Sequence, residues 1–535
     1  MDVVQKTKRL RVQSSRSRSG CKTCRLRHVK CDESIPSCRK CVRANRTCRY
    51  QDGITDAPTT KYVVYTLPEN LGLCAAIPPR ERRALWHFQH RTAQQIEGSF
   101  GYGFWSTIVP RLVQDDAIIR QAVLALSAFH EHYLDHDVAC PCLSDNALRW
   151  YQKARQQVID LDSPDNFFDS ILCACIIFCT CDALLGNFEL ANQHAVSGMK
   201  MIAGWRASTA TSSYASVFQS AEKNLGNLFR TLQAQIIEAN LDAIEVECPE
   251  VVEQMEDIPD HFDGAAEAFP HLQTLSTQVF SLFQDAEAYY KHNTWVPSRV
   301  SPPLQPSYNA ICAKYDAWKM AMSNCIDPAK GTDRGSQAAY LLLDILASSL
   351  EINLHVFVHG EPAYDDFRET NHAILNLVEE FLTIQSSIDT GLKPPTTHDQ
   401  HKQSSFGANH SSFTSSPEVV PLLFEIATRT NDGGLRQRAL QVLRSSSRRE
   451  STWDCRVAAS LAEKIVRLKQ QGAEQAGKYG TDCKFLITDI MLLSEQKCMV
   501  QYGFKRVRSG SFNSFWLENI CPGQGSLSSQ ILSIT

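Results

Sequence analysis

Six cysteines near the N-terminus constrain this chain more than any other feature. They follow the spacing C-x2-C-x6-C-x6-C-x2-C-x6-C, in which the unit C-x2-C-x6-C is written twice. Disulfide bonds and metal binding are the two interpretations of such a pattern. The N-terminal sequence MDVVQKTKRLRV has no apolar signal segment, which favours reduced thiols and a metal site. The six residues are Cys21, Cys24, Cys31, Cys38, Cys41 and Cys48.

The number of thiolates indicates how many ions they hold. Thiolate ligands select zinc, and C-x2-C lets two sulfurs reach one tetrahedral ion. Two zinc ions need eight ligand positions, which six sulfurs supply if two of them bridge. We therefore predict a binuclear zinc cluster, whose metal supplies most of the folding energy of a segment too short to bury its own core. A cluster closed in this way leaves no open coordination position for catalysis.

The stretch GCKTCRLRHVKCDESIPSCRKCVRANRTC resembles the fungal Zn2Cys6 binuclear zinc-cluster transcription regulators without a gap. The resemblance implies that Cys21 and Cys38 are the bridging ligands. It implies that Cys24 and Cys31 complete one zinc site, and Cys41 and Cys48 the other. It also implies a nuclear, sequence-specific DNA-binding regulator of the RNA polymerase II type.

The charge of the chain is divided sharply between this end and the rest. Residues 1–50 carry a net charge of +12 and the remainder −16, for a total of −4. A basic end of this kind is expected to meet a polyanion. In the family that the stretch resembles, the short helix after the second cysteine enters the major groove and reads a CGG triplet.

The same resemblance assigns roles to the basic residues around the first three cysteines. Arg27 and His28 are the base-reading candidates, and Lys30 is a phosphate candidate. Arg25 and Lys22 are further DNA-contact candidates. For His28 the alternative is a position merely near phosphate, because a neutral imidazole offers only one donor.

The chain divides into four predicted segments. Residues 1–20 form a basic arm, which serves as a nuclear localisation signal, a DNA-backbone arm or a solvated tail, and residues 21–50 form the cluster. Residues 51–75 read as a linker without the apolar heptads of a coiled coil. Dimerisation therefore needs another route, or the protein binds a single half-site. Residues 76–535 are predicted to be helical, with a loop insert at about 389–417.

The helical prediction rests on apolar residues spaced three and four apart, as in Ile119, Val123, Leu126 and Phe129. The stretches FWSTIVPRLVQDDAIIRQAVLALSAFHE and LRQRALQVLRSSSRRESTWD also resemble the fungal-specific transcription factor domain. That resemblance implies a regulatory role, with partner contacts and a possible small-molecule inducer. The predicted fold class is mainly α, with a small zinc cluster joined by a linker to a large all-helical regulatory domain.

Three other constellations were weighed as sites. Cys173, Cys175, Cys179 and Cys181 suggest a second metal site, but residues two apart on a helix face different ways, which favours core packing. The group from His130 to Cys142 lacks the H-E-x-x-H order and reads as a helix end and polar loop. Residues 238–263 mix acidic and apolar side chains, which indicates either a coactivator-recruiting segment or an acidic helix face.

The sequence also argues against two classes of protein. The most apolar stretch, Ile171 to Cys181, is about half of the roughly 20 residues that cross a bilayer, so we predict no membrane span. G-x-S-x-G, P-loop and G-x-G-x-x-G motifs are missing from the sequence, so we predict no enzyme. The leading hypothesis is a zinc-dependent DNA-binding regulator of a fungal metabolic or secondary-metabolite pathway. The alternative is a sensor or corepressor scaffold whose cluster is structural.

Overall fold

A computed structural model describes most of the chain as two compact units, residues 1–73 and 74–535. Each unit is considered by itself. The described residues are 20–34, 37–48, 77–100, 103–134, 145–161, 168–208, 257–290, 298–325, 333–391, 411–479, 483–494, 497–506 and 528–533. The predicted arm and linker therefore lie almost wholly outside the described residues, as does most of the acidic segment 238–263.

The N-terminal unit contains two very short helices, α1 (Lys22–Leu26) and α2 (Arg39–Val42). Each begins directly after a cysteine that caps it. Cysteines make up the buried cluster of this unit, while Leu26 and Val42 are exposed. A segment with so little apolar burial depends on another source of stability, which agrees with a metal-organised fold.

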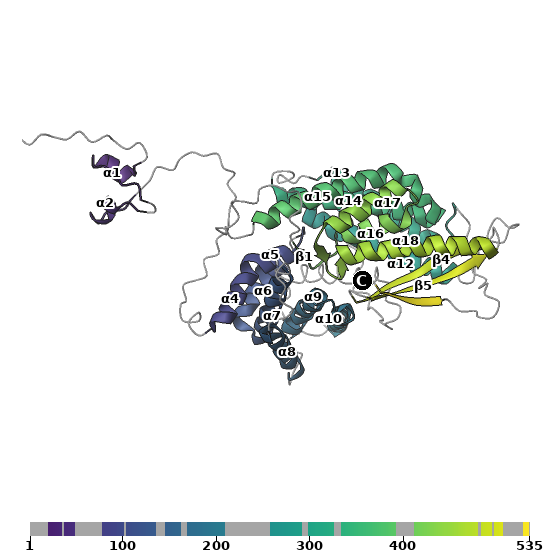
Figure 1. Cartoon of the computed structure of the whole chain (residues 1–535), viewed down its shortest axis with the longest axis horizontal. Coiled ribbons are helices and arrows are strands. Elements are labelled where there is room, and N and C mark those ends of the chain that lie inside the picture. Colours follow the sequence, from purple (N-terminus) through teal and green to yellow (C-terminus); the bar gives the residue numbers. More distant parts are fainter. Residues whose placement is uncertain are drawn as a thin grey trace, which may run out of the picture. The chain divides into compact units, whose positions relative to one another are not determined.

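The second unit is mainly helical, as predicted, and it begins with a helical group around one apolar core (Figure 1). Its long helix α7 (Ala117–Leu134) packs against α8 (Asp145–Ile159) and α9 (Phe168–Leu184), and α9 packs against α10 (Phe188–Ser208). The α9 helix is buried on all sides, which explains its apolar sequence without periodicity. The shorter elements are α4 (Pro79–His87), the π-helix η1 (Phe88–Thr92), α5 (Ala93–Ile96), the π-helix η2 (Phe104–Ile108) and α6 (Val109–Asp115).

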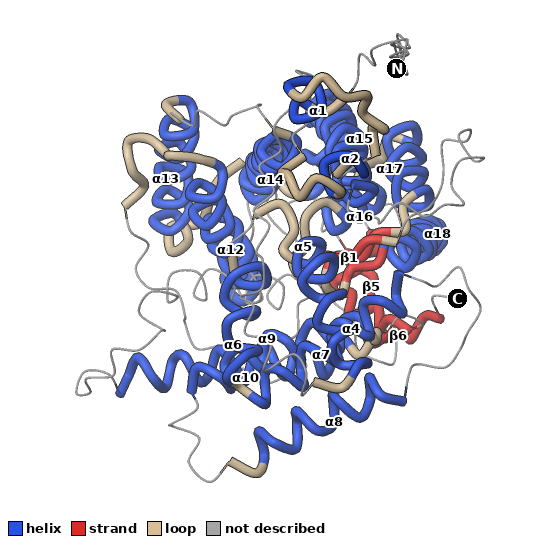
Figure 2. The backbone as a smooth tube through the Cα atoms, turned by 90° about the vertical axis from the view of Figure 1, so that its left-hand side faces the viewer, coloured by secondary structure: helices blue, strands red, loops and turns tan. Residues whose placement is uncertain are grey.

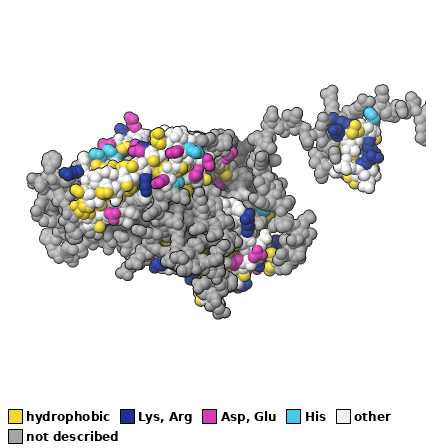
Figure 3. Space-filling view, turned by 180° about the vertical axis from the view of Figure 1, so that it is seen from behind, with side chains coloured by type: hydrophobic (Ala, Val, Ile, Leu, Met, Phe, Trp, Pro, Cys, Tyr) yellow, Lys and Arg dark blue, Asp and Glu magenta, His cyan; other side chains and the backbone are white. Residues whose placement is uncertain are grey.

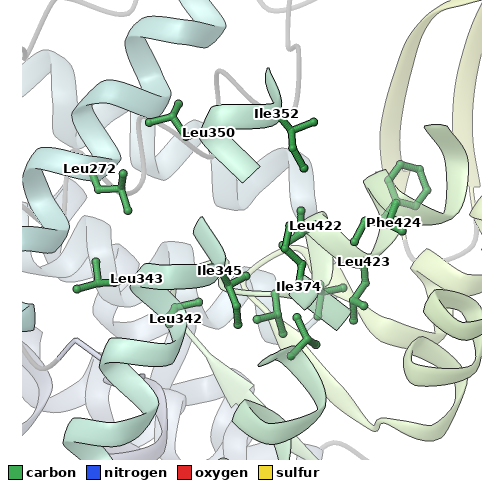
Figure 4. Packing of buried hydrophobic residues seen from close by; sticks show 14 of the residues in the cluster. Leu272, Leu342, Leu343, Ile345, Leu350, Ile352, Ile374, Leu422, Leu423 and Phe424 are labelled. Atoms are coloured by element: carbon green, nitrogen blue, oxygen red, sulfur yellow. The ribbon is translucent and has the colours of Figure 1, made fainter. Parts of the chain in front are cut away.

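A second helical group surrounds a larger apolar core, part of which Figure 4 shows. Its centre is α14, which packs against α12 and α15, while α16 packs against α17 and α18. The side chains of Leu342, Ile345 and Leu423 are buried in this core. The elements are α12 (Ala265–Tyr290), α13 (Gln305–Ser323), α14 (Arg334–His359), the 3-10 helix η5 (Glu361–Phe367), α15 (Arg368–Gly391), α16 (Val420–Arg429), α17 (Gly433–Ser445) and α18 (Cys455–Tyr479).

Helix α14 is long and apolar enough to cross a membrane by length and composition, with a mean hydropathy of 1.6 over an 18-residue window. The most apolar unbroken stretch of the sequence, Ile171 to Cys181, lies instead in α9. Eleven side chains of α14, including Leu342, Leu343 and Leu350, are buried in the core between α12 and α15. Its apolar composition therefore has a sufficient cause in packing within this unit.

Two small sheets were not anticipated from the sequence. Strand β1 (Ser412–Thr414) pairs in parallel with β2 (Arg448–Glu450), which pairs antiparallel with β3 (Trp453–Asp454). Antiparallel strands β4 (Cys483–Ser494), β5 (Lys497–Arg506) and β6 (Ser528–Ser533) form the other sheet. Part of the predicted loop at 389–417 is thus ordered, because α15 continues to Gly391 and β1 lies beyond it.

Strand β1 joins the two helical groups, and Figure 2 shows it beside α5. Phe413 is buried in the core of the first group. The amide of Ser415 donates to the Ile96 carbonyl at 3.1 Å, and the Trp105 indole donates to the Ser415 hydroxyl at 3.3 Å. Arg449 of β2 donates to the carbonyls at the end of α9. Residues far apart in sequence therefore hold the two groups together.

We call these contacts between the two helical groups the β1 joint. A buried ionic network lies next to it. Arg448 pairs with Glu418 and, at 2.6 Å, with Glu450. All three side chains are 4% exposed or less. One oxygen of Glu450 accepts the amide hydrogens of Glu418, Val419 and Val420 at 2.7–2.9 Å. These amides precede and begin α16, where a helix offers unpaired donors and a partial positive charge.

Candidate nucleic-acid interface and metal centre

The two cysteine repeats of the N-terminal unit adopt the same local structure. In the first repeat, the Cys24 amide donates to the Cys21 thiol at 3.3 Å, and the Cys21 amide donates to the Cys31 thiol at 3.4 Å. In the second repeat, the equivalent bonds run from Cys41 to Cys38 at 3.4 Å and from Cys38 to Cys48 at 3.3 Å. The repeat in the sequence is thus a repeat in structure, with α1 and α2 in corresponding places.

These repeats bring all six predicted ligands together as two overlapping groups of four. One group is Cys21, Cys24, Cys31 and Cys38; the other is Cys21, Cys38, Cys41 and Cys48. Within each group the sulfur atoms lie within 4.8 Å of one another, and Cys21 and Cys38 belong to both. Four clustered and mostly buried sulfurs are the donor set that tetrahedral zinc prefers, so the residues fit this metal.

The local structure also biases which thiols ionise. Burial raises the pKa of Cys21 and Cys38, but hydrogen bonds from the Cys24 and Cys41 amides and from neighbouring thiols outweigh it, so the net pKa of both is lowered. Burial raises the pKa of Cys41, and hydrogen bonding with Cys38 and Cys21 acts in the same direction. The thiolate is the form that binds metal, and the amide hydrogen bonds favour this form at the two thiols shared by both groups.

Asp32 links the two repeats, and sequence reasoning did not single it out. Its carboxylate accepts hydrogen bonds from the Ser34 hydroxyl at 2.6 Å and from the Arg39 amide at 3.0 Å. These bonds, the Ser34 hydroxyl first, lower the pKa of Asp32 to about 2. Asp32 thereby caps the start of α2 from the loop that follows Cys31. The signal that could have found it is an acid directly after a cysteine in a strongly basic segment.

The predicted DNA-contact residues all lie on the exposed surface of this unit. Lys22 and Arg25 lie on α1, Arg27 is its C-terminal cap, and His28 and Lys30 follow it. His28 has a φ of 54°, a left-handed conformation that turns the chain sharply at the end of α1. In Figure 3, dark blue Lys and Arg side chains form patches on the visible face of the unit.

The second repeat adds cations to the same small unit. Arg39, Lys40, Arg43 and Arg46 are exposed. The Arg27 guanidinium donates to the Lys40 carbonyl at 3.5 Å, so one predicted base reader touches the backbone of α2. A dense set of cations on a metal-organised module is suited to the phosphates of a nucleic acid.

The cysteines of α9 are core residues. Cys173, Cys175, Cys179 and Cys181 are each at most 7% exposed. Burial raises the pKa of the Cys175 and Cys179 thiols to about 12, which keeps them neutral and unreactive. Among the described residues, groups of three or more clustered ligands occur only in the N-terminal unit.

His130 lies near the end of a helix, in keeping with the predicted helix end, but not in a polar loop. The α7 helix continues to Leu134, and His130 is fully buried within it. Its Nε2 lies 2.7 Å from the Gln95 side-chain oxygen, and its Nδ1 lies 3.1 Å from the Thr92 hydroxyl. The Gln95 oxygen also accepts the Phe413 amide at 3.3 Å, so His130 is part of the hydrogen bonding at the β1 joint. Glu131 and His132 of its constellation lie on the same helix, whereas His136, Asp137, Cys140 and Cys142 lie outside the described residues.

Fold and site together define a class of protein. Its members combine a small thiolate metal centre with a cationic surface and a larger helical part. Residues 19–56 match the family described as "Fungal Zn(2)-Cys(6) binuclear cluster domain". The chain is similar over most of its length to a fungal transcription regulator, and its N-terminal cysteine segment is similar to several others. No solved structure matches the chain.

The relatives differ in how much of the chain they match. The "Aspercryptin biosynthesis cluster-specific transcription regulator atnN" of Emericella nidulans is 24% identical over 95% of both chains. The "Zn(2)-C6 fungal-type transcription factor afumD" of Aspergillus fumigatus is 33% identical over 25% of this chain and 38% of its own. "Adhesion and hyphal regulator 1" of Candida albicans is 57% identical over 37 residues, 7% of this chain and 6% of its own. The first likeness thus spans both units, and the last is short.

Proposed function

We propose that residues 21–50 hold two zinc ions and read CGG-type half-sites in double-stranded DNA. The observation that carries this proposal is the pair of overlapping cysteine groups that share Cys21 and Cys38. Two tetrahedral ions need eight ligand positions, and two shared thiolates let six cysteines supply them. Cys21 and Cys38 then bridge the ions, Cys24 and Cys31 complete one, and Cys41 and Cys48 complete the other.

The cluster positions a short helix, and the helix positions the DNA contacts. Arg27 donates to the O6 and N7 acceptors of guanine, which suit a guanidinium, and His28 adds a single donor nearby. Lys30, Arg25 and Lys22 bind phosphates and set the register of the module on the duplex. The exposure of all five side chains supports these roles.

The helical unit serves as the regulatory part of a nuclear transcription factor and does no catalysis of its own. It contacts coactivators or responds to a small-molecule inducer, and any homodimer forms by a route other than a coiled coil. The relative in Emericella nidulans is named for a biosynthesis cluster. This name supports the regulation of a fungal metabolic or secondary-metabolite pathway.

The alternative is a sensor or corepressor scaffold in which the zinc cluster serves structure or protein contact. The density of exposed cations around the cluster favours the DNA reader, because a purely structural cluster needs no such surface. The two functions differ in whether binding depends on DNA sequence.

Selection from a random duplex library with the zinc-loaded full chain tests the proposal. We expect enrichment of a CGG-type triplet, either single or paired at a fixed spacing. Arg27→Ala should relax discrimination within the triplet by about 1–3 kcal/mol, whereas Lys30→Ala should weaken binding to all sequences alike. Binding without sequence enrichment, with two zinc ions present per chain, would instead support the scaffold.

A further inference from the structure

A cavity of about 130 Å³ lies between α12, α14 and the start of α16, within the larger helical core and partly open to solvent. Its apolar wall includes Phe269 and Leu272 of α12, Leu350 of α14 and Leu422 of α16. Figure 4 shows Leu272, Leu350 and Leu422 projecting from these three helices. An apolar cavity of about 150 Å³ accepts benzene, so this space suits a single six-membered ring.

The polar part of the cavity is acidic. Glu418 and Glu425 line it, and none of the described residues that line it is Lys or Arg. Glu418 is 4% exposed and Glu425 is 25% exposed, so neither carboxylate is fully solvated. Each is already paired with an arginine outside the lining, Arg448 and Arg429 respectively. An ionised carboxylate has about four acceptor positions, so these pairs leave capacity for another donor.

The charges behind Glu418 are unbalanced. Arg448 is paired directly with Glu418 and Glu450, and the charge of Asp389 also acts on it. Two buried carboxylates therefore share one guanidinium, with Asp389 as a further negative charge nearby, and of the three only Glu418 lines the cavity. Buried charge without a counter-ion is unfavourable. A cation placed in the cavity beside Glu418 would reduce this imbalance.

Glu418 also connects the cavity to the joint between the two helical groups. Its other oxygen accepts the Ser99 amide at 2.9 Å. The neighbouring Gly98 has a φ of +69°, and a Cβ there would lie 2.9 Å from that oxygen. A group bound to Glu418 therefore acts on the same carboxylate that fastens residues 98–99 to the start of α16.

We propose that this cavity binds a small organic cation that combines one apolar ring with a primary amine. The ring occupies the wall formed by Leu272, Leu350 and Leu422. The ammonium group donates to the carboxylates of Glu418 and Glu425. Occupancy strengthens the joint, because it adds a counter-ion to the acidic side of the buried network.

The test is calorimetric titration of the full zinc-loaded chain, without DNA, with 2-phenylethylamine as the probe. We expect saturable binding of one probe per chain and a higher thermal unfolding midpoint. The anion of similar shape, 3-phenylpropionate, should bind at least about tenfold more weakly. Equal binding of the two probes, or no saturable binding of the amine, would overturn the proposal.

Two matched substitutions on α14 locate the binding. Ser349 lines the cavity, so Ser349→Trp should fill it and abolish binding of the amine. The adjacent Ser348 is not among the lining residues, and Ser348→Trp should bind the amine as the unmodified chain does. Ser276→Trp on α12 is a second filling variant, should the first fail to fold by circular dichroism. Unchanged binding in a folded filling variant would overturn the proposed location. Because no DNA is present, failure here leaves the proposed DNA reading untouched.

Discussion

At the residue scale, Cys21 and Cys38 stand apart from the other cysteines of the N-terminal unit. Each is the N-terminal cap of a short helix, and each belongs to both groups of clustered sulfurs. Loss of either shared thiol removes a ligand from both groups, whereas loss of Cys24 or Cys48 removes a ligand from one. The consequences of substitution should differ accordingly.

We expect Cys38→Ala to abolish zinc loading and DNA binding, because both proposed metal sites lose a ligand. Elemental analysis of zinc per chain and a DNA mobility-shift titration measure the two effects. Cys325→Ala is the matched control, since Cys325 lies on the helical unit beside the Tyr340 hydroxyl. Two zinc ions and unchanged DNA affinity in Cys38→Ala would contradict the bridging role.

His130 predicts a pH dependence for the helical unit. Burial lowers the pKa of His130 well below 6.5, with the nearby His87 and Arg91 acting in the same direction. As the pH falls below about 6.5, this histidine therefore binds a proton in the unfolded chain but stays neutral in the folded chain. The free energy of unfolding decreases as a result. This residue alone contributes a slope of up to about 1.4 kcal/mol per pH unit.

We expect His130→Gln to make the loss of stability between pH 6.5 and 5 shallower. Urea unfolding followed by tryptophan fluorescence measures it, because all 8 tryptophans lie between Trp86 and Trp516, in the helical unit. His28→Gln, in the other unit, is the control and should leave the slope unchanged. If His130→Gln keeps the original slope, another group causes the acid sensitivity.

At the scale of elements, ion pairs and charge-assisted hydrogen bonds hold strand β2 against the start of α16. Glu450 of β2 accepts three amide hydrogens at this helix start, and Arg448 pairs with both Glu450 and Glu418. A buried pair of this kind adds little by itself, because desolvation offsets the attraction. Removal of one partner is costly, because it leaves the other charge buried and unpaired.

We expect Arg448→Met to lower the free energy of unfolding by about 3–5 kcal/mol. Arg444→Met is the matched control, because Arg444 pairs with Glu463 on the surface with 51% of its side chain exposed. Such a surface pair contributes about 0–1 kcal/mol. Urea unfolding of both variants measures the two losses of unfolding free energy. Equal losses would mean that the buried network does not hold the joint.

At the scale of the whole molecule, the N-terminal end and the rest of the chain differ in the sign of their net charge. The basic end carries +12 within residues 1–50, and the remainder carries −16, so the larger part of the chain repels a polyanion. DNA affinity should therefore depend on the phosphate contacts of the small unit alone.

The salt dependence of DNA binding then indicates whether one or two zinc-cluster units bind each DNA site. Three phosphate contacts, by Lys22, Arg25 and Lys30, give a slope of log affinity against log salt of about −2.7. Two modules on a paired site double this to about −5.4. Fluorescence anisotropy of labelled duplex at several salt concentrations measures the slope. A slope near zero would contradict the phosphate roles and favour the scaffold.

Much of this protein follows from its sequence, because the relevant interactions are local. The spacing of six cysteines predicts a metal cluster, and the amides that bond to each thiol lie within ten residues of it. The three-and-four spacing of apolar residues predicted the helix that contains Ile119 and Phe129. In both cases the residues that determine the local structure lie within one short stretch of the chain.

The remaining features depend on residues that meet only in the folded chain. Ser415 bonds to the Ile96 carbonyl across 319 residues, and His130 is buried because Gln95 and the β1 joint cover it. Strand β1 forms because β2 lies beside it, and the acidic cavity forms because α12, α14 and α16 converge. Local periodicity does not predict such pairings, since the two partners lie far apart in the sequence and neither one identifies the other. Sequence alone therefore predicts the metal chemistry of the small unit and the helical character of the large one, whereas the joint and the cavity arise from long-range packing.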